Sequence, residues 1–242
     1  MQTLMDRLRQ IREEGSYADF DRLLPQCAYY FTNRGWHQCL LTQIPLPGGP
    51  QNPLTILNTI EPEFCEEYHR LELFKYDNHQ IALLKLGRPV SRIECINYCA
   101  DRERAEAFEQ IVEAFRFGHG VVVPLFDYPL KRLAFIACGT GPDPTARDLL
   151  EVELMMRELV GTFFHLNQNA KFKSDSLTNQ ERRVLEGAAR GNSSERIAEL
   201  LSISTNTVNV HITNCQRKLQ SSNRVETVAK ALFYREILLD PL

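Results

Sequence analysis

The sequence has no long apolar run, and this absence excludes a predicted membrane-spanning helix, which needs about 18 consecutive apolar residues. The N-terminal stretch MQTLMDRLRQIREEG is charged and amphipathic, and it lacks the apolar centre of a secretory signal. Seven cysteines, an odd number at irregular spacing, do not resemble a disulfide framework. We therefore expect a cytoplasmic protein with reduced thiols.

Recognisable catalytic and metal-binding patterns are missing as well. No nucleophile, base and orienting group occur together at a familiar spacing. The pairs Cys95 with Cys99 and His37 with Cys39 do not supply the close set of four ligands that a metal site needs. Residues 40–60 contain no Asp, which excludes a phosphoacceptor receiver domain. We expect no enzyme activity, no metal and no other cofactor.

The sequence is nevertheless rich enough in apolar residues, at 43% of 242, to bury a sizeable core. Its length suits two domains of unequal size. The polar, aperiodic stretch NQNAKFKSDS at 167–176 follows a long helical pattern and precedes short, well-capped helices. We therefore expect a first domain over residues 1–166, a linker over 167–175 and a second domain over 176–242.

The first domain is expected to be α+β. Helical spacing marks residues 4–11, 20–31, 62–74, 102–117 and 149–163, whereas strand patterns mark 36–44, 54–60, 121–126 and 132–138. The last two strands are separated by a short turn, which is typical of a hairpin. The pattern predicts an α/β/α sandwich around a mostly antiparallel sheet.

Acidic residues are absent from the segment 200–225, although the whole chain carries a net charge of −3. Residues 174–242 hold nine Lys or Arg against eight Asp or Glu, and residues 1–173 hold 19 against 23. A basic face confined to one small segment is typical of a nucleic-acid-binding module. A solvated helix face gives the same pattern, so charge alone leaves both interpretations open.

Capping signals divide the second domain into four predicted helices. Thr178 and Glu181 form a capping box, Gly191 is placed to end the first helix, Ser193 or Ser194 begins the second, and Ser204 or Thr205 begins the third. The third helix carries an apolar stripe, and the second and fourth have inward positions of their own. The expected inward residues are Ile197, Leu200, Leu201, Val208, Ile212, Cys215, Leu219, Val225, Val228, Ala229 and Leu232.

The outer face of the third helix is polar and basic, which predicts an all-α helix-turn-helix domain that places this helix in the DNA major groove. Asn and Arg side chains there suit base edges, and Thr, His and Lys suit phosphates. Asn209 and Thr213 are expected to face bases. The full set of expected DNA contacts is Asn206, Thr207, Asn209, His211, Thr213, Arg217 and Lys218. The alternative is a helical hairpin packed on the first domain.

The segments LTNQERRVL, GNSSERIAELLSISTNTVNVHITNCQRKL and SSNRVETVAKA resemble the DNA-binding domain of LuxR-type transcription regulators over about 60 residues. Arg196 departs from the pattern, because the family usually has Glu there to brace the helices. The resemblance implies a homodimer that binds an inverted repeat in double-stranded DNA, with RNA polymerase as a further candidate partner.

The first domain resembles the autoinducer-binding domain of quorum-sensing LuxR regulators through Tyr68, Asp77, Gly120, Pro124 and the segment FGHGVVVPL. In that family the pocket binds an N-acyl-homoserine lactone. The resemblance makes Asp77 the acceptor of the ligand amide and Tyr68 a pocket wall. Phe64 replaces the lactone-binding Trp, Ile60 an acyl-contacting Tyr, Arg92 a second Trp and Asn78 a Pro, while Ile136 or Ala137 falls at a Ser/Thr position. The predicted ligand-binding residues are Ile60, Phe64, Tyr68, Asp77, Arg92 and Ile136.

These replacements remove hydrogen-bond partners for two ligand carbonyls, so we expect an atypical or orphan member whose small-molecule signal is not a standard acyl-homoserine lactone. For Arg92 three readings stay open: it pairs with Asp77 in a nearly empty core, it clamps an acidic or carbonyl-rich ligand, or it points to solvent. The alternative to a ligand-controlled regulator is a ligand-independent dimeric regulator, or an interaction protein that modulates other regulators.

Overall fold

A computed structural model of the chain describes residues 1–46, 53–75, 77–98, 102–126, 132–167 and 177–239. The chain forms two compact units. Unit 1 contains Met1–Gln43, Thr55–Asp127 and Leu133–Phe172, and unit 2 contains Ile44–Leu54, Tyr128–Arg132 and Lys173–Leu242. The expected linker at 167–175 lies, apart from Asn167, outside the described residues.

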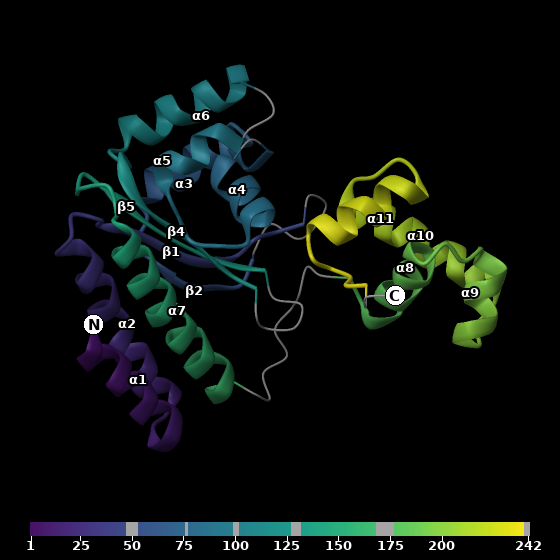
Figure 1. Ribbon diagram of the computed structural model, residues 1–242, viewed down its shortest axis with the longest axis horizontal. Helices are drawn as coiled ribbons and strands as arrows, with labels where there is room; N and C mark the ends of the chain where they lie inside the picture. The colour runs from purple at the N-terminus through teal and green to yellow at the C-terminus, as the bar shows by residue number, and fades with distance from the viewer. Residues whose placement is uncertain (47–52, 76, 99–101, 127–131, 168–176, 240–242) are drawn as a thin grey trace. The chain divides into compact units, whose positions relative to one another are not determined.

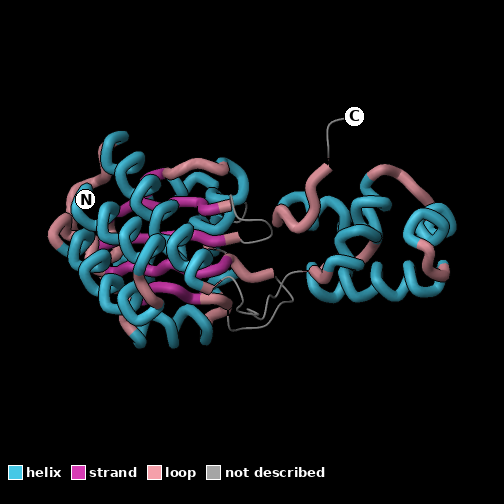
Figure 2. Tube along the Cα trace, turned by 90° about the horizontal axis from the view of Figure 1, so that it is seen from below, coloured by secondary structure: helices cyan, strands magenta, loops and turns pink. Residues whose placement is uncertain are grey.

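Unit 1 is built on a five-stranded sheet in the order β2-β1-β5-β4-β3, in which every pairing is antiparallel. Figures 1 and 2 show these strands side by side. The strands are β1 (Gln38–Gln43), β2 (Thr55–Asn58), β3 (Val90–Ser91), β4 (His119–Leu125) and β5 (Leu133–Gly139). Only glycine fits at position 120 on β4, because a Cβ there would overlap the carbonyl oxygen of Ala137 on β5.

Helices cover both faces of the sheet, as Figure 1 shows. One face carries α1 (Gln2–Glu14), α2 (Tyr17–Thr32) and α7 (Ala146–Leu166). The other carries α3 (Pro62–Arg70), α4 (Asn78–Leu86), α5 (Arg92–Cys95) and α6 (Arg102–Ala114), with short 3₁₀ turns η1 (Leu73–Lys75) and η2 (Ile96–Tyr98). This arrangement confirms the predicted layered sandwich.

The sequence pattern identified the long elements of unit 1 and missed the short ones. The predicted hairpin strands are adjacent, since β4 and β5 pair from His119–Gly139 to Leu125–Leu133. The predicted helix 62–74 is shorter, because α3 ends at Arg70 and a 3₁₀ turn follows. The segment with β3, α4 and α5 was not predicted. This missed segment matters because it holds Asp77, Asn78 and Arg92.

Unit 2 contains the four helices expected for the second domain: α8 (Asn179–Ala189), α9 (Ser194–Leu201), α10 (Thr205–Leu219) and α11 (Arg224–Phe233). The capping box of Thr178 and Glu181 is present, and Ser193 and Ser204 cap α9 and α10. Gly191 follows α8 with a φ of 81°, in the left-handed region that favours glycine. The stripe Val208, Ile212, Cys215 and Leu219 is buried.

Two of the expected inward faces in unit 2 are wrong in part, since Ile197 and Leu201 on α9 and Val228 on α11 do pack against the core. Leu200 on α9 is 53% exposed, and on α11 Val225 is 79% exposed while Ala229 and Leu232 also lie on the exposed face. The buried residues of α11 are instead Thr227 and Ala231. Thr227 tolerates burial because its hydroxyl donates to the carbonyl of Asn223 at 2.6 Å and lies 2.8 Å from the Ser221 hydroxyl.

Candidate functional site

The outer face of α10 presents a polar surface without acidic residues. Asn206, Asn209, Thr213 and Arg217 are exposed, whereas Thr207, His211 and Lys218 are half-buried at its edges. The buried stripe on the other side of α10 packs against α8 and α9 and so fixes which side chains face outward. The helix therefore offers amide, hydroxyl and guanidinium groups on one surface, which suits hydrogen bonding to base edges and phosphates.

Asn209 is held in place by a short chain of hydrogen bonds that sequence reasoning missed. Arg224, at the start of α11, donates to the carbonyl of Asn192 at 2.6 Å and to Oγ of Ser194 at 3.2 Å. Ser194 in turn donates to Oδ1 of Asn209 at 3.0 Å. With its carbonyl engaged, the Asn209 amide directs its Nδ2 donor away from Ser194. In the sequence, Ser194 and Arg224 were marked only by their position. Both lie within the segments that resemble the LuxR-type DNA-binding domain, and both stand at the start of a helix.

Lys218 has a partner inside the protein rather than a free position on the outer face. Its Nζ lies 2.8 Å from Oε2 of Glu181, and the Lys218 side chain is only 20% exposed. Glu181 also accepts from the backbone N–H of Thr178 at 2.6 Å. Burial raises the pKa of Glu181, but Lys218 and the Thr178 bonds outweigh it and hold that pKa below its usual value. Lys218 thus ties α10 to the first turn of α8.

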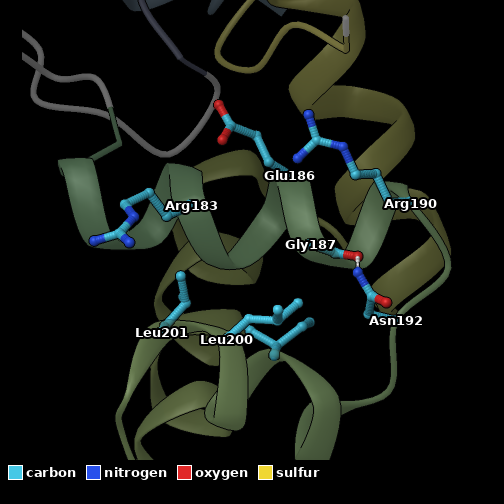
Figure 3. A pocket seen from close by; sticks show the side chains of 8 residues that line it. Arg183, Glu186, Gly187, Arg190, Asn192, Leu200 and Leu201 are labelled. Atoms are coloured by element: carbon cyan, nitrogen blue, oxygen red, sulfur yellow. Dashed lines mark hydrogen bonds between the residues drawn. The ribbon is translucent and has the colours of Figure 1, made fainter. Parts of the chain in front are cut away.

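A small hollow in unit 2 lies between α8 and α9, as Figure 3 shows. Gly187 forms part of its wall, and a Cβ at this position would press on the Ile197 side chain. Asn192 closes one end by donating to the carbonyl of Gly187 at 3.1 Å. None of the residues predicted to bind a ligand lines this hollow.

Four of the six predicted ligand-binding residues come together in one apolar cluster of unit 1. Ile60, Phe64, Tyr68 and Ile136 are half-buried and pack against a buried centre that includes Phe108 and Phe117. The Phe64 ring lies 4.6 Å from that of Phe117 and 5.9 Å from that of Tyr68, measured between centroids. The cluster provides an aromatic, partly exposed surface beside the buried acid Asp77.

Asp77 is buried and surrounded by hydrogen-bond donors of the chain itself. Its Oδ2 accepts from the Tyr68 hydroxyl at 2.8 Å and from Gln80 at 3.3 Å. Its Oδ1 accepts from the backbone N–H of His79 at 2.9 Å and lies 3.1 Å from Nδ1 of the same residue. Burial raises the pKa of Asp77, but His79 and Tyr68 outweigh it and the pKa lies below its usual value. The carboxylate is therefore ionised, and it already accepts hydrogen bonds from the chain itself.

Arg92 forms its ion pair with Glu109 and not with Asp77. The side chain is buried, with the residue 2% exposed, and its Nη1 lies 2.5 Å from Oε2 of Glu109 on α6. Its Nε donates to the carbonyl of Gly118 at 2.9 Å. The reading that Arg92 points to solvent is therefore wrong, and the partner expected in the nearly empty core, Asp77, is replaced by Glu109.

The described residues contain neither a cluster of metal-ligating side chains nor a membrane-spanning helix. No group of three or more His, Cys, Asp or Glu in that part of the chain is arranged to hold a metal ion. Within the same residues, no helix combines the length and hydropathy needed to cross a membrane.

The fold and these two surfaces define a two-domain protein: an α/β domain with a half-exposed aromatic cluster beside a buried acid, and a four-helix helix-turn-helix domain. Residues 175–231 match the model of the luxR family of bacterial regulatory proteins. This match identifies the helix-turn-helix segment of unit 2 as a LuxR-type DNA-binding domain.

Individual relatives match over parts of their length. The chain is 40% identical over 82 residues to the transcriptional activator LuxR of Aliivibrio fischeri, covering 34% of this chain and 32% of that protein. It is 32% identical over 142 residues to the quorum sensing-dependent regulator RpaR of Rhodopseudomonas palustris, covering 54% and 55%. The matched segments thus span at most about half the length of these curated relatives.

The fold itself extends over nearly the whole chain. The crystal structure of Escherichia coli SdiA superposes with a TM-score of 0.53 at 19% identity, covering 98% of both chains. A structure of SdiA in complex with octanoyl-rac-glycerol gives the same TM-score and covers 96% of this chain and 94% of that one. At this identity the likeness establishes the shared fold.

Proposed function

We propose that the protein is a sequence-specific transcription regulator that binds double-stranded DNA as a homodimer and acts in the cytoplasm. The outer face of α10 is the observation that carries this proposal. Its exposed Asn206, Asn209, Thr213 and Arg217 stand on a helix with no acidic residue, and the chain of hydrogen bonds through Ser194 orients Asn209. Pre-oriented donors of this kind suit base-edge recognition.

The exposed apolar residues support the homodimer. Val225, Ala229 and Leu232 follow one another on α11 at helical spacing and are uncovered in the single chain. Unit 1 has a comparable pair, since Leu150 and Leu154 on α7 are 57% and 46% exposed. A second copy of the chain covers such faces in a symmetric dimer, and a dimer matches an inverted repeat.

The ligand is proposed to be a small molecule held by the aromatic cluster of unit 1, and not a standard acyl-homoserine lactone. Asp77 already accepts from Tyr68, Gln80 and His79, so a ligand amide would have to displace one of these donors. Ile60 and Ile136 bring no hydroxyl to the acyl carbonyl. SdiA, which shares the fold, has been crystallised with octanoyl-rac-glycerol, so the same architecture accommodates a different class of acyl compound.

The DNA-binding proposal is tested by selection from a pool of random duplexes with the purified full chain. The expected result is enrichment of an inverted repeat by the unmodified protein. Asn209→Ala and Arg217→Ala should lose that enrichment, and Arg196→Ala, an exposed arginine on α9 that pairs with Glu199, should keep it. Failure of the unmodified protein to enrich any duplex would overturn the proposal.

A ligand-independent regulator is the second candidate, favoured by the buried Arg92–Glu109 pair and the internally satisfied Asp77. These contacts give unit 1 polar support of its own. Extraction of the purified protein followed by mass spectrometry separates the two candidates. A DNA-competent protein that yields no bound small molecule supports ligand independence, and a stoichiometric small molecule supports the ligand-controlled regulator.

A further inference from the structure

Asn78 is a buried polar residue whose hydrogen-bonding capacity is unused. It begins α4 directly after Asp77, and the residue is 0% exposed. Among the described residues, neither its Oδ1 nor its Nδ2 has a hydrogen-bond partner. A buried amide with both atoms unpaired is rare in folded proteins, because water is lost and nothing replaces it. Such a group calls for a partner that is not part of the chain.

His79 adds a second unused polar atom next to it. Its Nδ1 lies 3.1 Å from Oδ1 of Asp77, so the carboxylate holds one side of the ring and Nε2 points away from it. In the described part of the structure Nε2 is buried and has no partner. Asp77 thereby fixes the ring and leaves an unpaired ring nitrogen one residue after the Asn78 amide.

His79, the residue after Asn78, joins this segment to the aromatic cluster. The His79 ring packs edge-on against Phe108 with centroids 5.6 Å apart, and Phe108 belongs to the buried centre of that cluster. Tyr68, another member, bonds to Asp77. The half-exposed Phe64 and Phe115 rings are 5.3 Å apart in an edge-on contact. A polar corner thus meets an apolar, partly exposed surface, which is the usual composition of a small-molecule site.

The chemistry of an Asn side chain restricts what pairs with it. Oδ1 accepts and Nδ2 donates on adjacent positions of one planar group. A primary carboxamide or a cyclic amide presents a carbonyl and an N–H side by side and pairs with both atoms at once. A trans secondary amide, as in a linear acyl-amide, points its carbonyl and N–H in opposite directions and pairs with only one.

We propose that Asn78 is the polar anchor for a small molecule that carries a cis-amide edge, either a primary carboxamide or a lactam, and an apolar body that lies on the aromatic cluster. His79 Nε2 makes a further hydrogen bond to the same molecule. The proposal rests on the proposed small-molecule sensing by unit 1 and names the class of that signal.

The test measures thermal unfolding of the purified full chain with two probes that differ in one methyl group. Octanamide offers the cis-amide edge, and N-methyloctanamide is a trans secondary amide with the same chain. The expected result is a saturable rise in the unfolding midpoint, half-complete at a concentration at least tenfold lower for octanamide. Equal concentrations for the two probes, or no rise with either, would overturn the anchor and leave ordered water as the partner of Asn78.

The variant Asn78→Leu, which keeps the branched four-atom side chain and removes its polar atoms, gives the second arm. Without probe it should unfold at or above the midpoint of the unmodified protein, because an unpaired polar group has been removed. It should also lose the octanamide shift. An unchanged octanamide shift in Asn78→Leu contradicts the proposal. If this variant does not fold, the comparison of the two probes on the unmodified protein still decides.

The outcome is independent of DNA binding. A tenfold preference for octanamide in a protein that enriches no duplex would sustain the anchor and refute the regulator. Duplex enrichment with no effect of octanamide would refute the anchor alone.

Discussion

The ammonium of Lys218 lies 2.8 Å from the carboxylate of Glu181, so that α10 and the first turn of α8 are joined by an ion pair with little exposure to solvent. The same carboxylate completes the capping box with Thr178. One acidic residue therefore fixes the start of α8 and the position of the helix proposed to enter DNA. Lys218 is accordingly assigned a role in positioning α10, and the remaining six residues of the predicted set are left for direct contact.

Replacing Lys218 with Met should destabilise unit 2, because the buried Glu181 loses its charged partner. A cost of about 1–3 kcal/mol is expected. Hydrogen exchange followed by mass spectrometry checks this on peptides from α8 and α10, which should exchange faster. The control is Lys230→Met, which breaks the more exposed pair with Glu226 and should destabilise unit 2 less than Lys218→Met does. Equal protection in Lys218→Met and the unmodified protein would return Lys218 to the DNA contacts.

Glu181 also predicts a pH dependence. Its pKa in the folded protein lies below the ordinary value of 4.5, so its contribution to stability is present above that value and is lost as the pH falls through the folded pKa. The urea midpoint of the unmodified protein should fall on acidification below about pH 5, and part of the fall should be absent from Glu181→Gln. Parallel curves for the two proteins would show that the ion pair contributes nothing.

The sequence predicted unit 2 better than unit 1 because helix caps and apolar stripes are local signals. Thr178, Ser193 and Ser204 act within one turn of their helices; Thr178 was predicted outright, and each serine was one of two adjacent candidates. On α11 the pattern failed in part, because the hydrogen-bonded Thr227 is buried and the apolar Val225 is exposed. A tertiary contact decides such a case, and no local pattern records it.

In unit 1 four residues of the aromatic cluster, Ile60, Phe64, Tyr68 and Ile136, were named through the family resemblance, whereas the buried centre of the cluster and the polar contacts were not. The partner of Arg92 is Glu109, which is 17 residues away on another helix. The acid that the sequence analysis considered as its partner was Asp77. Similarly, nothing in the spacing of Asn78 shows that its amide is buried and unpaired. These features depend on how α4, α5 and α6 pack together with β4, which is a property of the folded domain.

The Arg92–Glu109 pair should be essential to unit 1, because removing one partner leaves a buried charge uncompensated. Arg92→Met is expected to destabilise the chain by about 3–5 kcal/mol, and Arg92→Met combined with Glu109→Leu should recover much of that loss. Chemical unfolding monitored by Trp36, the single tryptophan and a buried residue of unit 1, measures this. Arg88→Met, which breaks an exposed pair with Glu94, is the matched control. A neutral Arg92→Met would instead favour a ligand-clamping role.

Ser194 should influence DNA recognition without touching DNA. It donates to Oδ1 of Asn209 and accepts from Arg224, so Ser194→Ala frees the Asn209 amide to rotate. We expect a loss of about fivefold in affinity for the selected repeat, the equivalent of one hydrogen bond. Competition binding with Ser194→Ala, Asn209→Ala and the double variant measures it, and the effects should be less than additive. Fully additive effects would show that Ser194 does not act through Asn209.

The exposed face of α11 should determine how much tighter a full inverted repeat binds than a single half-site. Val225→Asp places a charge on a face proposed to meet its own copy, and burying an unpaired charge at such a contact is costly. The ratio of affinities for the two duplexes should therefore fall about tenfold or more toward one, which corresponds to roughly 1.4 kcal/mol or more. Half-site binding itself should be retained, because all of the proposed DNA contacts are on α10 and none of them is changed. Leu200→Asp, at a residue that is 53% exposed on α9, provides the matched control and should leave the ratio unchanged. A ratio unaffected by Val225→Asp would place the pairing of the two copies elsewhere, with Leu150 and Leu154 on α7 as the face to test next.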